Sequence, residues 1–319
     1  MLKNIHTIGR YWKDKYGEKI YKVPISISGF TCPNIDGTVT KGGCTFCEND
    51  SFSPNLVKQK NSSFKLHPNN PDNPYLDNQL EQLKDQFEIT SKNLSNKFGA
   101  KKFIVYFQSF TNTYAPFDTL KALYDTALSF DNVVGMSIGT RTDSITEEIL
   151  DYLQELNKDK EIWIEYGIQS IYDDTLEKIN RGHDFANIKE WIIKTKKRDL
   201  KVCGHIIFGL PDETKQMMLN TTKETLALGV DSVKYHALYV TKNTALAKDY
   251  QNGNFTPISE DDYIEMVVQS IQMHPENISI QRISSGINDD SLLSPMWCKN
   301  KHQQMFKLRE ALNKIGFNY

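Results

Sequence analysis

The feature that most constrains the fold is an alternation, from Tyr21 onward, of short apolar runs with longer helical patterns. Short runs rich in β-branched and aromatic residues favour strands, and apolar residues spaced three and four apart favour helices. Strands that alternate with helices are typical of βαβ units, which build a parallel sheet. We expect six strands, at Val23–Ser28, Phe103–Gln108, Val133–Ile138, Ile162–Ile168, Val202–Phe208 and Ser232–Leu238.

Helical patterns lie between these strands, and one of them follows a capping-box pattern formed by Ser144 and Glu147. Six β-α units suffice for an α/β fold of the open, partial (β/α)6 TIM-like barrel type. We divide the chain into an N-terminal extension (1–20), the barrel (21–285) and a C-terminal helical extension (286–319), with a further candidate strand at Ser279–Ile283. The expected helices are Leu76–Phe98, Asp118–Phe130, Ile145–Asn157, Ile188–Arg198, Lys215–Leu228 and, in the C-terminal extension, Lys301–Ile315.

Composition excludes several classes of protein. No apolar run reaches the roughly 18 residues of a membrane helix, and the polar N-terminus lacks the apolar segment of a signal peptide. An odd number of cysteines, five, argues against a disulfide scaffold. We therefore expect a cytoplasmic protein with no membrane partner. The net charge of −2 gives no global sign of nucleic-acid binding, so any such binding would use local patches.

Three of the five cysteines, Cys32, Cys44 and Cys47, lie within sixteen residues of each other. Thiolates suit iron–sulfur clusters and zinc. A closed zinc site takes four ligands, and the nearest further candidates, His6 and His67, lie well outside this loop. The pattern therefore favours a [4Fe–4S] cluster whose fourth iron is left for a small molecule. A zinc knuckle and a redox pair formed by Cys44 and Cys47 stay open as alternatives.

The loop TCPNIDGTVTKGGCTFCEN, residues 31–49, resembles the cluster loop of radical S-adenosylmethionine (SAM) enzymes. The usual spacing in that family is C-x3-C-x2-C. The spacing here, C-x11-C-x2-C, is similar to the branch that includes the catalytic subunit of Elongator and the YhcC/YtqA-type proteins. The resemblance implies a radical SAM barrel, a cluster on Cys32, Cys44 and Cys47, and SAM as the second cofactor. It also implies a reductant such as flavodoxin or ferredoxin, whose electron cleaves SAM to methionine and a 5′-deoxyadenosyl radical.

Polar residues follow the ends of the expected strands, where a (β/α) barrel places its chemistry. Thr111, Asn112 and Thr113 follow the second strand, where relatives hold the SAM amino group, although a plain polar turn is the alternative. The G-x-Q-S and N-R-G-H motifs resemble those of the Elongator and coproporphyrinogen oxidase groups. They imply that Gln169 reaches the SAM ribose and that Arg181 binds the SAM carboxylate, which suits a guanidinium.

Three further positions are candidates by the same resemblance. Ile207 would line the adenine through its backbone. Arg141 follows the third strand and is a candidate contact to SAM. The alternative role is a surface ion pair with Asp143. Cys298, in a P-x-W-C segment, could return a hydrogen atom to a substrate radical, whereas a buried structural cysteine is the alternative. Cys203 fits a buried apolar position.

Of all the parts of the function, the substrate is the one that the sequence determines least. The Elongator-like branch implies the side chain of a wobble uridine in tRNA. A small metabolite or a protein as substrate, and a non-enzymatic zinc-dependent RNA-binding module, stay open. Two basic runs, Lys194–Lys201 and Lys299–Tyr319, each carry five basic residues and one acidic residue and could contact phosphates. Solvated helix faces are the alternative for both runs.

Overall fold

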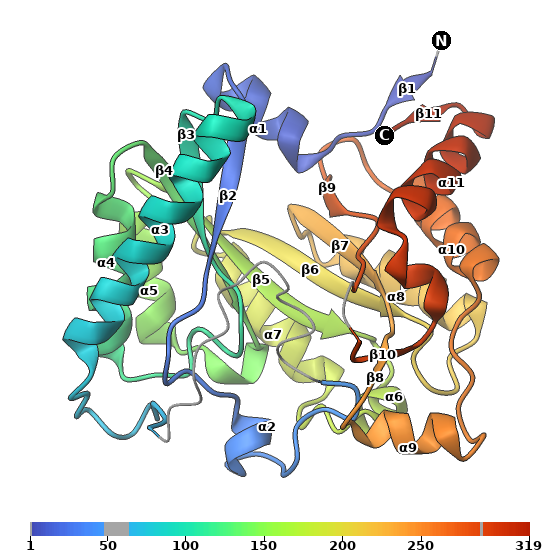
Figure 1. The fold of residues 1–319 in the computed structure, drawn as a ribbon, viewed down its shortest axis with the longest axis horizontal. Helices are drawn as coiled ribbons and strands as arrows, with labels where there is room; N and C mark the ends of the chain where they lie inside the picture. The colour runs from blue at the N-terminus through green and yellow to red at the C-terminus, as the bar shows by residue number, and fades with distance from the viewer. Residues whose placement is uncertain (1, 48–63, 288–289) are drawn as a thin grey trace.

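The computed structural model describes residues 2–47, 64–287 and 290–319, and its centre is a curled parallel sheet (Figure 1). The sheet has seven strands in the order β2-β3-β4-β5-β6-β7-β9. The predicted partial barrel is thereby confirmed, and β9 falls at the further candidate strand. The strands are β2 (Ile20–Ile25), β3 (Lys102–Phe107), β4 (Val133–Thr140), β5 (Glu161–Gln169), β6 (Lys201–Phe208), β7 (Ser232–Ala237) and β9 (Ser279–Arg282).

Helices cover the outer face of the sheet, as the βαβ connections require (Figure 1). They are α3 (Leu76–Phe98), α4 (Phe117–Ser129), α5 (Glu147–Leu156), α6 (Asp173–Lys178), α7 (Phe185–Lys196), α8 (Lys215–Ala227) and α10 (Glu260–Gln272). The predicted capping box is wrong. Ser144 belongs to a short 3₁₀ helix, Thr142–Ser144, and Thr146 caps α5 by accepting from the Ile149 amide at 3.2 Å.

The two faces of each strand differ in polarity. In β5, Ile164 and Tyr166 are fully buried, and the Tyr166 hydroxyl contacts the Thr195 hydroxyl of α7 at 2.8 Å. The alternate residues of the same strand, Glu165 and Gly167, line an interior cavity. Because side chains alternate along a strand, the apolar set packs under the helices and the polar set fills the barrel.

Helix α1 (Ile8–Tyr16) covers the end of the barrel at which the strands begin. Its residues converge on Glu161, the first residue of β5, whose carboxylate accepts from Trp12 Nε1 at 2.7 Å and from the Tyr16 hydroxyl at 3.0 Å. Lys15 forms an ion pair with the same carboxylate at 2.5 Å. Glu161 and Trp12 are both buried. This hydrogen-bonded lid leaves the opposite end of the barrel for ligands.

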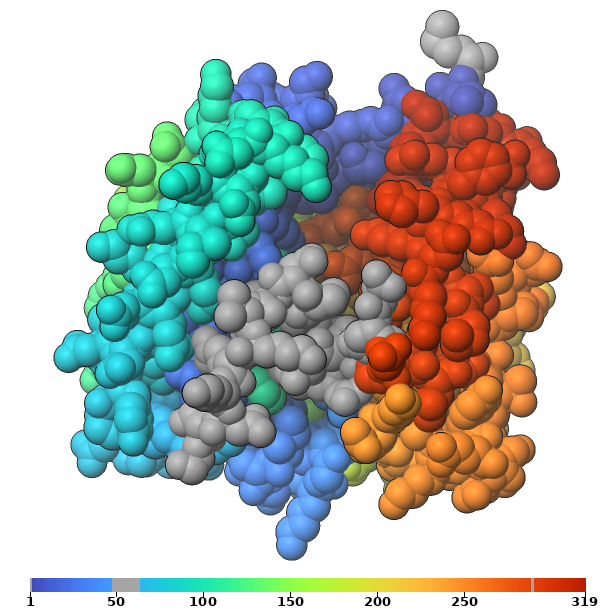
Figure 2. All heavy atoms as spheres, viewed as in Figure 1, coloured from blue at the N-terminus to red at the C-terminus, as the bar shows by residue number. Residues whose placement is uncertain are grey.

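The remaining elements lie around this barrel. They are α2 (Pro33–Asp36), α9 (Ala245–Gln251), α11 (Lys301–Lys314), and the strand pairs β1 (Lys3–Asn4) with β11 (Phe317–Asn318) and β8 (Val240–Thr241) with β10 (Leu292–Ser294). Figure 2 shows α11 and α3 on opposite sides of one face. Within the described ranges, no helix combines the length and apolar character that a membrane crossing requires.

Candidate active site

One cavity at the C-terminal end of the sheet gathers most of the predicted site residues. The carboxyl ends of parallel strands meet at one edge, so loops that are distant in sequence contribute to the same space. The predicted residues that line it are Cys32, Cys44, Cys47, Thr111, Arg141, Gln169, Arg181 and Ile207. Asn112, Thr113 and Cys298 are not among its lining residues.

The cysteine loop is tied to the segment that carries Arg181. Cys32 precedes α2, and the Cys47 amide donates to the Cys44 carbonyl at 2.9 Å, which closes the turn between these two cysteines. Asn34, fully buried, donates through Nδ2 to the carbonyls of Asn180 at 2.6 Å and Arg181 at 2.9 Å. The cysteines and Arg181 are therefore held in one unit.

Two guanidinium groups lie beside the cysteine sulfurs. Arg141 Nη1 is 3.8 Å from Cys32 Sγ, and Arg181 Nη1 is 4.0 Å from Cys44 Sγ. Burial, followed by the charges of Cys44 and Cys32, raises the pKa of the Cys47 thiol to about 12, and the two arginines oppose this rise. Three crowded thiols become thiolates together only if a cation binds them. The donor set therefore fits a cationic iron–sulfur cluster.

Two buried polar atoms next to the cysteines lack partners. Gln169 Oε1 and Arg181 Nε have no hydrogen bond within the part of the chain that the structure describes. Arg181 Nη2 donates to the Gly167 carbonyl at 2.6 Å. A Cβ at Gly167 would lie 2.6 Å from Gln169 Nε2 and 2.8 Å from Arg181 Nη2, so only glycine leaves room for both side chains. Because buried polar atoms are nearly always paired, these two fit a polar ligand such as SAM.

Arg141 and Asp143 do form the ion pair that the sequence suggested, but it is buried rather than at the surface. Arg141 Nε donates to Asp143 Oδ1 at 2.8 Å, and Arg141 Nη2 donates to the Arg181 carbonyl at 2.7 Å. Burial alone would raise the pKa of Asp143, but hydrogen bonds from Arg141 and His183 hold it below its ordinary value. The pair fixes the loop after β4 against the Arg181 segment.

The side chains of Asn112 and Thr113 hold the loop after β3 in place instead of facing the cavity. Asn112 Nδ2 donates to the Gly139 carbonyl at 2.9 Å, and Thr113 Oγ1 lies 2.6 Å from Thr140 Oγ1. Both residues are almost completely buried. Of the three polar residues predicted here to contact SAM, only Thr111 lines the cavity.

Cys298 is fully buried in the short 3₁₀ helix Met296–Lys299, and burial raises the pKa of its thiol. This position fits the structural alternative, and hydrogen-atom donation by Cys298 stays a prediction. Cys203 is also fully buried, as expected.

The sequence analysis missed an ion-pair network inside the barrel. Glu165, only 1% exposed, forms ion pairs with Lys22 and Lys234 and accepts from Ser137 Oγ at 2.6 Å. Burial alone would raise the pKa of Glu165, but the two ammonium groups hold it well below its ordinary value. A charged residue at the centre of an otherwise apolar strand is rarely buried without a partner, and that signal could have found the network.

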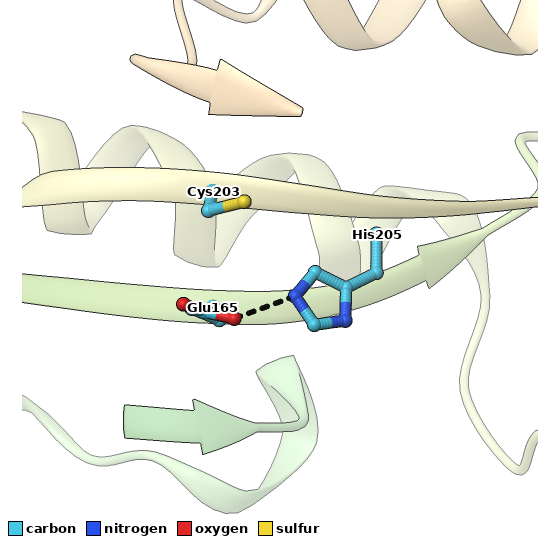
Figure 3. Close-up of side chains that lie close together, drawn as sticks. All are labelled: Glu165, Cys203 and His205. Atoms are coloured by element: carbon cyan, nitrogen blue, oxygen red, sulfur yellow. Dashed lines mark hydrogen bonds and ion pairs between the residues drawn. The ribbon is translucent and has the colours of Figure 1, made fainter. Parts of the chain in front are cut away.

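Figure 3 shows Glu165 with Cys203 and His205, whose potential ligand atoms lie within 4.8 Å of one another. His205 Nε2 is 2.8 Å from the Glu165 carboxylate. A divalent ion here would have to displace Lys22 and Lys234 from that carboxylate, and burial raises the pKa of the Cys203 thiol to about 12. We therefore interpret this group as part of the ion-pair network and not as a metal site.

Comparisons with known proteins agree with this geometry. The family model described as the radical SAM superfamily matches residues 37–224, and that of the radical SAM C-terminal domain matches residues 230–314. The chain is 34% identical to YtqA of Bacillus subtilis over 98% of this chain and 91% of that protein. It is 35% identical to YhcC of Escherichia coli over 99% of this chain and 94% of that protein.

More distant similarities cover less of the matched proteins. A segment covering 56% of this chain is 26% identical to the tRNA uridine(34) acetyltransferase of Methanocaldococcus infernus and spans 33% of that protein. Among solved structures, Elp3 of Methanocaldococcus infernus is similar in fold, with a TM-score of 0.63 at 17% identity over 93% of this chain and 63% of that one.

Proposed function

The chain belongs to the radical SAM superfamily of enzymes, and from this premise we propose that it modifies the side chain of a wobble uridine in tRNA. Enzymes of this family use a [4Fe–4S] cluster and SAM. When bound, the cluster supplies the electron that cleaves SAM to methionine and a 5′-deoxyadenosyl radical, which abstracts hydrogen from the substrate. The protein's task is to bind, orient and shield these groups.

Different residues of the cavity would bind the cluster and SAM. Cys32, Cys44 and Cys47 would hold the cluster, with the unpartnered atoms of Gln169 and Arg181 beside them for the SAM ribose and carboxylate. An amide can both donate to and accept from a diol, and a guanidinium pairs with a carboxylate.

Two other lining residues complete the SAM site. Thr111 would contact the amino end of SAM, and the Ile207 backbone would line the adenine. The electron would come from a reductant such as flavodoxin or ferredoxin.

Replacing Arg181 by alanine should weaken SAM binding while the cluster stays bound. Loss of a charge-assisted hydrogen bond costs about 1.5–3 kcal/mol, or roughly ten- to over a hundred-fold in affinity. Gln169→Ala should weaken binding in the same direction. The measurement is a SAM titration of reconstituted protein, with Arg309→Ala, an exposed arginine on α11, as the matched control. Wild-type SAM affinity in both cavity variants would show that SAM binds elsewhere.

Support for tRNA comes from the similarity to a tRNA uridine(34) acetyltransferase and from a basic surface on α11 and the turn before it. Exposed Lys299, Lys301, Arg309 and Lys314 have no ion-pair partner within the described ranges, whereas Lys307 pairs with Glu260. Partial burial and then the nearby Arg282 cation lower the pKa of Lys301. Lys301, one of the four unpaired residues that define this basic surface, therefore lies near Arg282, which lines the cavity.

The other basic run of the sequence, Lys194–Lys201, differs because most of its cations form ion pairs. Lys194 and Arg198 pair with Glu147, and Lys196 and Lys201 pair with Asp231. Neighbouring acids thus neutralise most of its charge, which leaves the basic surface as the better candidate for phosphate contacts.

Charge reversal of Lys299, Lys301 and Arg309 to glutamate should weaken tRNA binding and flatten its salt dependence, because fewer counterions are released. SAM cleavage without tRNA should be unchanged. Binding is measured by filter retention or fluorescence anisotropy across a salt series. Reversal of Lys92, Lys97 and Lys101, at or just after α3 on the opposite side, makes the same change in charge and is the control (Figure 2).

The outcome decides between substrate classes. If the wild-type protein shows no salt-sensitive tRNA binding at low ionic strength, a small metabolite or a protein replaces tRNA as the proposed substrate. In that case the SAM titration above is unaffected, because it tests the cofactor site alone.

A further inference from the structure

The cavity extends past the residues assigned to the cluster and SAM. His205, His236 and Arg282 also line it, from β6, β7 and β9. In the register of the sheet, His205 pairs with Lys234, and Lys234 pairs with Arg282, so these three form one row across the barrel. Ile207 and His236 form another row, two residues closer to the cysteine edge. The Arg282 row therefore lies deeper than the SAM residue Ile207.

Arg282 differs from the other arginines of the cavity. Arg141 pairs with Asp143, and Arg181 donates to the Gly167 carbonyl. The Arg282 guanidinium has neither a hydrogen bond nor an ion pair with any residue that the structure describes, although it is partly buried. A guanidinium that has left water in part and has no acceptor is costly unless a ligand supplies one.

The charges around Arg282 are not balanced by the residues that the structure describes. The carboxylate of Glu165 is already shared by Lys22 and Lys234. Lys22 also donates to Gln281 Oε1 at 2.7 Å, and Lys234 donates to the Tyr106 hydroxyl at 3.0 Å. Among the described residues, Lys22, Lys234 and Arg282 therefore share this part of the interior with the one carboxylate of Glu165, and Arg282 is the cation without a counter-ion there.

Two imidazoles complete this part of the cavity. The rings of His205 and His236 lie 5.7 Å apart, and His236 Nε2 is buried without a hydrogen-bond partner among the described residues. Burial lowers the pKa of His205 to about 4, and burial followed by Arg282 holds the pKa of His236 well below its ordinary value. Both rings are therefore neutral near pH 7. The one N–H of His205 donates from Nε2 to the Glu165 carboxylate at 2.8 Å, so His236 is the ring whose N–H can donate to a ligand.

We propose that Arg282 and His236 bind an anionic group of the substrate, a carboxylate or a phosphate, with His236 in the row of Ile207 and Arg282 in the next deeper row. A guanidinium takes such a group through two parallel hydrogen bonds, and the imidazole N–H supplies a third. Bound there, the anion anchors one end of the substrate and leaves its reacting carbon toward the SAM residues. This inference rests on the proposed function only in taking the cavity as the place where substrate meets the radical.

The test uses reconstituted protein with SAM bound and two simple probes, acetate and inorganic phosphate, followed by isothermal titration calorimetry. We expect one probe to bind the wild type, and Arg282→Gln to weaken that binding roughly ten- to a hundred-fold. Lys97→Gln removes an exposed cation from α3, outside both proposed binding sites, and should leave it unchanged. Binding of acetate alone identifies a carboxylate, and binding of phosphate alone identifies a phosphate.

Two results would overturn the proposal: no binding of either probe to the wild type, or equal binding to the wild type and Arg282→Gln. His236→Ala provides a second variant and should also weaken binding while SAM affinity is retained. The readout does not involve tRNA. Anion binding that depends on Arg282 in a protein without tRNA affinity would keep this inference and reject only tRNA as the substrate.

Discussion

Replacing Cys44 by alanine is expected to give a folded chain that binds no [4Fe–4S] cluster and forms no 5′-deoxyadenosine. A cluster that keeps one iron open has three protein thiolates, so the loss of any one removes a bond that no nearby group replaces. Iron and labile sulfide measured after anaerobic reconstitution should give about four of each in the wild type and almost none in the variant. Cys32→Ala and Cys47→Ala should behave in the same way.

Cys203→Ala is the matched control, because it removes a cysteine that is fully buried outside the lining of the cavity. It should retain iron and sulfide. Stoichiometric zinc without labile sulfide in the wild type, or full iron content in all three loop variants, would contradict the assignment of the cluster.

Glu165→Gln should be among the most destabilising single changes in the barrel. It leaves Lys22 and Lys234 buried without their shared carboxylate, and loss of one partner of a buried ion pair costs about 3–5 kcal/mol. The free energy of unfolding, measured by urea denaturation, should fall by about that amount. Adding Lys234→Met should restore part of the loss, because it removes one of the two unpaired charges.

The effect of Glu165→Gln on stability should depend on pH. The pKa of Glu165 is depressed in the folded protein, so its contribution to stability is present above its unfolded pKa of about 4.3 and is lost as the pH falls through the folded value. The part of the difference between wild type and Glu165→Gln that comes from the carboxylate should therefore be lost only as the pH falls below about 4. Equal stability of the two proteins at pH 7 would show that the network does not support the fold.

Much of the fold could be predicted because local patterns encode it. The helix predicted at Leu76–Phe98 has those bounds in the structure, and each strand predicted for the barrel overlaps a strand of the sheet. The cap of α5 could not be predicted, since Ser144 and Thr146 both fit the start of a helix. The choice depends on tertiary contacts: the Ser144 carbonyl accepts from Thr113 of the preceding β-α loop, which holds Ser144 in its own turn.

The sequence did predict several of the residues that line one cavity, among them Cys44, Gln169 and Arg181. The contacts of a residue could not be predicted where they depend on the direction in which its side chain points. Asn112 faces the Gly139 carbonyl of the neighbouring strand, and only the pairing of β3 with β4 determines that. Lys22 and Lys234 reach Glu165 from strands far apart in sequence, so the network exists only once the register of the whole sheet is known.

The hydrogen-bonded lid that α1 forms on Glu161 also has a consequence for the order in which ligands bind. In the described part of the chain, it covers the end of the barrel that lies opposite the cysteine edge. Substrate and SAM would then reach their proposed sites from the cysteine edge. Because the Arg282 row lies deeper than Ile207, a large substrate held there would bind before SAM or together with it, whereas a small anion could enter beside bound SAM.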